Sequence, residues 1–180
     1  MPSMRIPSEF CEYKATVEKC SYDEDNNVTL IRSQEEMVDY DKVKYDYAVA
    51  VSPELVPCSV DGLFLDEKDE YILVEFKAGV IEIPNILKKA YDSAFILAEK
   101  KTVNVSWLRK NVEFILVFNP ETAFSDPNQK SRYNMMRLGT KYSTKKIEFF
   151  QKAMRGLKGF IYKNVSELTA DEFSDKYLKI

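Results

Sequence analysis

The segment CSVDGLFLDEKDEYILVEFKAG, residues 58–79, decides the fold because it has the pattern of an antiparallel β-hairpin. Its two ends, 59–65 and 71–77, are rich in Val, Ile, Leu, Phe and Tyr, which favour strands. The polar tract Asp-Glu-Lys-Asp between them is typical of a turn. A turn centred on this tract sets a register in which Asp61 and Glu75 face each other.

Side chains alternate between the two faces of a strand, so the hairpin has two predicted faces. One face is wholly apolar and is expected to lie on the core, namely Val60, Gly62, Phe64, Ile72, Val74 and Phe76. The other face is apolar near the turn and charged at its far end, where Asp61, Glu75 and Lys77 come together. Opposed carboxylates about 5 Å apart repel each other, and a divalent cation offsets this repulsion. The charged end therefore predicts a metal site, with a lysine placed for a scissile phosphate.

The triplet Glu-x-Lys is not specific on its own, because residues 12–14 and 99–101 repeat it. Only the copy at 75–77 lies in a strand pattern and follows an aspartate at hairpin distance. The alternative interpretation makes the three charged residues surface groups at the frayed end of the hairpin, with the lysine as a salt-bridge partner.

Composition narrows the possible chemistry. The chain contains no histidine, which excludes Ser-His and Cys-His nucleophile pairs, histidine bases and His-containing zinc sites. Its three cysteines lack metal-ligand spacing and are expected to be free thiols. A length of 180 residues with 45% hydrophobic content favours one domain over residues 1–180. Without a long apolar run or a signal-like start, we expect a cytoplasmic protein outside the membrane.

Charge is distributed unevenly along the chain. Residues 1–127 carry 14 basic and 24 acidic side chains, whereas residues 128–164 carry ten basic and one acidic. We call residues 128–164 the basic extension, and this composition is typical of a surface that binds a phosphate backbone. It predicts nucleic-acid contacts by Lys141, Lys145, Lys146, Lys152 and Arg155. The alternative is a solvated helix face that balances the acidic half.

Local patterns predict the elements around the hairpin. We expect helices over 9–20, from a capping box at 33–36, over 84–100, over 143–155 and from the capping box at 169–172. We expect strands over 28–31, 45–51, 112–118 and 160–165. The continuous apolar run 112–118 is typical of a buried central strand.

At Asp61 and Glu75-Phe76-Lys77 the sequence resembles the PD-(D/E)XK nuclease superfamily, also called the restriction-endonuclease-like fold. The resemblance implies an α/β domain whose central mixed β-sheet is flanked by helices. The family's core order of helix, three strands, helix and strand can be laid over about residues 33–118, roughly half of the chain.

Two features depart from the family pattern. Pro57 stands four residues before Asp61 instead of next to it. Leu87 stands four residues before Tyr91, where the RecB-like exonuclease branch has Gln-x-x-x-Tyr. The second departure argues against an exonuclease of that branch. The expected action is endonuclease-like, although these residues leave endo and exo action open.

The resemblance implies a hydrolase that cleaves DNA, with RNA less favoured, and that uses Mg²⁺ or Mn²⁺. The ion is expected on the carboxylates of Asp61 and Glu75 and on the backbone carbonyl of Phe76, with Lys77 orienting the nucleophile or neutralising the transition state. An acidic residue from a preceding helix often completes such sites. The candidates are Glu36 and Glu35, with Glu18 less favoured.

Other classes of function remain open at this point. A non-catalytic module that keeps the fold could bind nucleic acid or a protein partner through the basic extension. An enzyme acting on small phosphorylated molecules is a third interpretation. A homodimer is compatible with each of the three.

Overall fold

The sheet of this protein has six strands and mixed direction. A computed structural model describes residues 4–52, 54–123 and 145–178, without the side chains of 145–149. The strands are β1 (Lys14–Thr16), β4 (Glu36–Asp39), β5 (Gly62–Leu65), β6 (Tyr71–Lys77), β7 (Val112–Phe118) and β8 (Asn164–Thr169), and they lie side by side in that order. Pairing is antiparallel from β1 to β6 and parallel from β6 to β8. A small separate hairpin joins β2 (Tyr22–Asp23) to β3 (Val28–Thr29).

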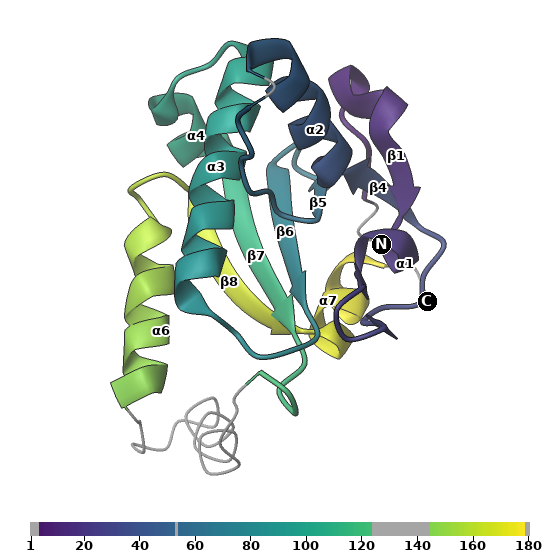
Figure 1. Cartoon of the computed structure of the whole chain (residues 1–180), viewed down its shortest axis with the longest axis vertical. Helices are drawn as coiled ribbons and strands as arrows, with labels where there is room; N and C mark the ends of the chain where they lie inside the picture. Colours follow the sequence, from purple (N-terminus) through teal and green to yellow (C-terminus); the bar gives the residue numbers. More distant parts are fainter. Residues whose placement is uncertain (1–3, 53, 124–144, 179–180) are drawn as a thin grey trace.

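Helices cover both faces of the sheet (Figure 1). They are the 3₁₀ helix η1 (Ser8–Tyr13), α1 (Val17–Cys20), α2 (Tyr40–Val51), α3 (Ile83–Lys101), α4 (Val105–Asn111), α6 (Lys145–Leu157) and α7 (Ala170–Tyr177). Buried residues of α2, α3, α4 and α6 form one apolar cluster with one face of the sheet, while those of α1 and α7 cluster on the other face. The chain is thus one α/β domain.

The predicted hairpin is present with the predicted register. Leu63 pairs with Leu73 and Gly62 with Val74. The predicted faces are confirmed too, because Phe64, Ile72, Val74 and Phe76 pack under α7 whereas Leu63 and Leu73 pack under α3. Val60 is the exception. It precedes β5, and it belongs to the α3 cluster.

The predictions before the hairpin are wrong in several places. The expected helix over 9–20 is divided into η1, β1 and α1. The expected helix from 33 is strand β4, and the expected strand over 45–51 is the second half of α2. Asp39 caps α2, since its side chain accepts a hydrogen bond from the Lys42 amide, which satisfies an end group of the helix. The order laid over 33–118 is therefore wrong at its start, where a strand precedes a helix.

The predictions after the hairpin agree better with the structure. α3, β7 and α6 lie close to their expected positions, and the capping box of Thr169 with Glu172 begins α7. β8 begins at Asn164, four residues later than expected, and α4 was not predicted. The three cysteines are free. Within the described ranges, no helix combines the length and apolarity needed to cross a membrane.

Two buried tyrosines hold α3 on the sheet. The hydroxyl of Tyr40 donates to the carbonyl of Ser93 at 3.0 Å, and the hydroxyl of Tyr162 donates to the carbonyl of Ala90 at 2.5 Å. Both rings are fully buried, and buried hydroxyls need such partners. The helix is thereby tied to an element before the hairpin and to a segment near the end of the chain.

Candidate functional site

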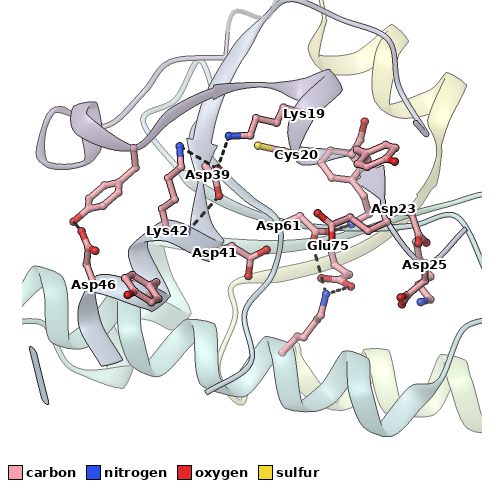
Figure 2. Close-up of a pocket in the computed structure, with 18 of the residues that line it drawn as sticks. Lys19, Cys20, Asp23, Asp25, Asp39, Asp41, Lys42, Asp46, Asp61 and Glu75 are labelled. Carbon is pink, nitrogen blue, oxygen red and sulfur yellow. Dashed lines mark hydrogen bonds and ion pairs between the residues drawn. The ribbon is translucent and has the colours of Figure 1, made fainter. Parts of the chain in front are cut away.

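An open pocket of about 830 Å³ lies where β6 ends beneath α3 (Figure 2). Its charged lining is mostly acidic. Nine carboxylates belong to Glu12, Asp23, Glu24, Asp25, Asp39, Asp41, Asp46, Asp61 and Glu75, against four lysines, Lys19, Lys42, Lys77 and Lys89. The charged end of the hairpin therefore opens into this pocket.

Asp61 and Glu75 lie side by side in this pocket, as Figure 2 shows. The ammonium of Lys89 lies 2.7 Å from Glu75 Oε1 and 3.6 Å from Asp61 Oδ1. Glu75 is 2% exposed, and its Oε2 atom is buried with no hydrogen-bond partner among the described residues. A lysine thus supplies part of the positive charge that two facing carboxylates require.

The position of Asp61 follows from two hydrogen bonds to β6. Its amide donates to the Val74 carbonyl at 3.0 Å, and its Oδ2 accepts from the Phe76 amide at 2.6 Å. The amide and carbonyl of one strand residue point to the same neighbouring strand, so the Phe76 carbonyl is on the side of β6 that faces Asp61. This edge of β6 therefore combines two carboxylates with a backbone carbonyl.

α3 holds the segment before Asp61 by two side-chain contacts. Asp92 Oδ2 accepts from the Cys58 amide, and Ser93 Oγ accepts from the Val60 amide, each at 2.9 Å. Lys89 lies one turn earlier on the same helix. Helix α3 thus carries both Lys89 and the two side chains that hold the segment before Asp61.

Burial dominates the electrostatics of the pair. It raises the pKa of Asp61 to about 6, although Lys89 and the Phe76 amide act in the opposite direction. Burial and the charge of Asp61 hold the pKa of Glu75 well above its usual range. Burial lowers the pKa of Lys89, but Glu75 and Asp61 outweigh burial and raise it overall. One ammonium therefore leaves part of the negative charge of the pair uncompensated.

This imbalance predicts a pH dependence of stability when divalent cations are removed. The folded protein binds a proton at Asp61 near pH 6, whereas the unfolded chain binds it near pH 4. The folded state therefore binds more protons in this window, and stability should rise as the pH falls from 7 to 5. Calorimetry in EDTA measures the unfolding temperature, and Asp61→Asn should reduce the rise. An unfolding temperature that falls over this range in the wild type would contradict the prediction.

The structure places the predicted site residues unevenly. Lys77 lines the pocket with Asp61 and Glu75. Glu36 does not, because it lies on β4 and pairs with Lys14 at 3.2 Å.

The other two acidic candidates also lie elsewhere, since neither Glu35 nor Glu18 lines the pocket. Glu18 accepts a hydrogen bond from Gln34 at 2.7 Å. In the described part of the chain, no group of three or more Cys, Asp or Glu side chains is close enough to hold a metal ion. The donor set at the pair is therefore two carboxylates and a backbone carbonyl.

Sequence reasoning missed most charged residues of the pocket, among them Asp39, Asp41 and Lys89. Asp39 pairs with Lys19 and Lys42 at 3.6 and 3.4 Å, as Figure 2 shows. A signal for Lys89 was available. It lies three residues after Ile86 and four before Ser93, both buried, so it falls on the helix face that packs against the sheet.

The part of the basic extension that the structure describes, residues 145–164, lies apart from the pocket. Lys141 is outside the described residues, and Lys145 and Lys146 begin α6. Lys152 and Arg155 are exposed on the same helix. α6 packs beside α3, on the side away from α2 (Figure 1). Helix α6, with Lys152 and Arg155, and the pocket are thus on opposite sides of α3.

Comparison of the chain with family models, with curated proteins and with solved structures found no match.

Proposed function

We propose that this protein is a metal-dependent phosphodiester hydrolase that acts on DNA. The convergence of Asp61, Glu75 and Lys77 in one open pocket carries the proposal. The unpartnered Oε2 of Glu75 supports it, because a buried polar atom without a partner is costly. A divalent cation is a ligand that two carboxylates and a carbonyl fit.

Mg²⁺ or Mn²⁺ would be held by Asp61, Glu75 and the Phe76 carbonyl. Such an ion acts as a Lewis acid toward the phosphate and lowers the pKa of water. Asp61 is oriented by the Phe76 amide, and Glu75 is fixed by burial, so both carboxylates are in place before the ion arrives. Lys77 presents a positive charge to a phosphate oxygen in the same pocket.

The acidic lining restricts how a polyanion approaches. Nine carboxylates against four lysines repel phosphate groups, so the pocket does not attract DNA by itself. The exposed Lys152 and Arg155 of α6 offer the attraction that the pocket lacks. We therefore assign binding and chemistry to different surfaces of the domain.

Cleavage assays test this function directly. Wild-type protein is incubated with supercoiled, linear, branched and single-stranded DNA in Mg²⁺, in Mn²⁺ or in EDTA. We expect products only with a divalent cation. Salt-dependent binding without cleavage of any substrate would favour the second candidate below. Absence of both binding and cleavage at low salt would exclude both nucleic-acid functions and leave a protein partner or a small phosphorylated substrate.

The second candidate is a non-catalytic module that binds DNA or a protein partner. The ion pairs of Lys89 with Asp61 and Glu75 favour it, because a permanently bound lysine would replace the metal. In this case the pocket is structural and only the basic extension functions.

Charge reversal on α6 tests the binding surface of both candidates. Replacing Lys145, Lys146 and Lys152 with Glu should weaken DNA binding at every sequence. Each lost phosphate contact should reduce the slope of log affinity against log salt by about one unit. Fluorescence anisotropy at several salt concentrations measures both effects.

A control with the same charge change replaces Lys68, Lys88 and Lys110 with Glu, all exposed elsewhere on the surface. It should keep most of the affinity and the salt slope. Equal losses in the two triple variants would mean that total charge, and not the basic helix, determines binding.

A further inference from the structure

Lys89 and its two partners differ in their freedom to move. The side chain of Lys89 is 31% exposed, whereas those of Asp61 and Glu75 are 18% and 2% exposed. The backbone of α3 is fixed on both sides by the hydroxyls of Tyr40 and Tyr162. Rotation about the flexible stem of the lysine can therefore remove its ammonium from the carboxylates without displacing helix or sheet.

The carboxylates remain under-compensated while the lysine is in place. Glu75 uses Oε1 for Lys89, and Oε2 has no hydrogen-bond partner among the described residues. Asp61 meets the ammonium only at 3.6 Å, beyond ordinary hydrogen-bond length. A divalent cation carries twice the charge and accepts several oxygen ligands, so it satisfies these oxygens better than one ammonium does.

We propose that Lys89 is an exchangeable counter-cation, which holds the Asp61 and Glu75 carboxylates together until a divalent cation displaces it. This inference rests on the proposed function, because it concerns how the same site is filled. The ammonium and the divalent cation compete for the same oxygens. The lysine therefore lowers the affinity for the metal and keeps the site ordered without it.

Displacement has a consequence for the substrate. The metal adds two positive charges to the acidic pocket, and the released ammonium of Lys89 remains in the pocket that Lys77 also lines. Both changes reduce the repulsion of a phosphate group. Metal binding should therefore precede the entry of a scissile phosphate.

Two substitutions at Lys89 test the exchange in opposite directions. Lys89→Met keeps the stem but removes the competing charge, so it should bind Mn²⁺ about ten- to a hundredfold more tightly, the worth of a hydrogen bond to a charged group. Lys89→Arg holds carboxylates with a planar fork of donors and should bind Mn²⁺ more weakly than the wild type. Lys88→Met, exposed on the same helix, should match the wild type. Isothermal titration calorimetry with Mn²⁺ alone provides the affinities.

Thermal unfolding gives a readout that is independent of activity. In EDTA, Lys89→Met should unfold at a lower temperature than Lys88→Met, because two buried carboxylates lose their cation. Saturating Mn²⁺ should restore the unfolding temperature of Lys89→Met, and the increase should be larger than in the wild type.

Three results would overturn the inference. Equal Mn²⁺ affinity in Lys89→Met and wild type would show that the lysine does not compete. Weaker binding in folded Lys89→Met would make the lysine an organiser of the site. If Lys89→Met does not fold, unchanged or tighter binding by Lys89→Arg decides against the exchange. Only the absence of Mn²⁺ binding in every folded variant would also remove the metal site of the proposed function.

Discussion

Asp61→Asn should lower the rate of metal-dependent DNA cleavage by roughly a thousandfold or more, while DNA binding survives. Asparagine keeps the shape of the side chain but removes one of the two charges that would hold the cation. A bound ion contributes several kcal/mol to such a reaction, and each 1.4 kcal/mol is about tenfold in rate. Nicking of supercoiled plasmid measures the rate, and fluorescence anisotropy measures the binding.

Asp69→Asn is the matched control for this substitution. Asp69 lies in the turn at the other end of the hairpin with φ 61°, a conformation that asparagine adopts well. Its side chain is 74% exposed, so cleavage should stay close to the wild-type rate. Similar rates in wild type and Asp61→Asn would remove Asp61 from the chemistry, and loss of DNA binding by Asp61→Asn would contradict the separation of the two surfaces.

Phe114→Ala should lower the free energy of unfolding by about 3 to 5 kcal/mol, the usual cost of removing a buried aromatic ring. Phe114 lies in strand β7, between β6 and β8. It is fully buried, and its ring centroid is 5.5 Å from that of Tyr162. The substitution leaves a cavity beneath α3, in the layer that supports the pocket. Urea denaturation followed by circular dichroism measures the change.

Phe160→Ala provides the comparison, because Phe160 is 58% exposed. Its loss should cost less than about 1 kcal/mol. A small effect at Phe114 would mean that the layer between α3 and β7 collapses around the missing ring, and an equal effect at Phe160 would mean that its surface position is wrong.

The hairpin could be predicted because its information is local. Alternating side chains and a polar turn set its register from Gly62 with Val74 to Leu65 with Tyr71. Asp61 lies just before β5 and beside Glu75 in the pocket. Helix α2 could not be predicted in the same way. Its sequence, YDKVKYDYAVAV, is rich in residues that favour strands. The cap from Asp39 and the burial of Val43 on one side of the helix override that preference.

The rest of the pocket depends on contacts between distant segments. Lys89 reaches the carboxylates only because α3 packs across the sheet, and Asp41 reaches the pocket only because α2 begins where β4 ends. Glu36 was proposed as a ligand on a helix, but residues 36–39 form a strand and turn it toward Lys14. The sequence of the hairpin does not predict the packing of α3, the start of α2 or the strand at 36–39.

Helix α7 covers the apolar face of the hairpin. Two rings of α7 pack edge-on against this face. The ring centroid of Phe173 is 6.2 Å from that of Phe64 and 5.5 Å from that of Phe76, and the ring centroid of Tyr177 is 5.1 Å from that of Phe64. A shortened protein that ends after β7 would remove these rings from Phe64 and Phe76. Phe76 follows Glu75 in the sequence, and its amide donates to Asp61. The segment 33–118 is therefore not a portable unit, and a graft of this site into another protein needs α7 as well.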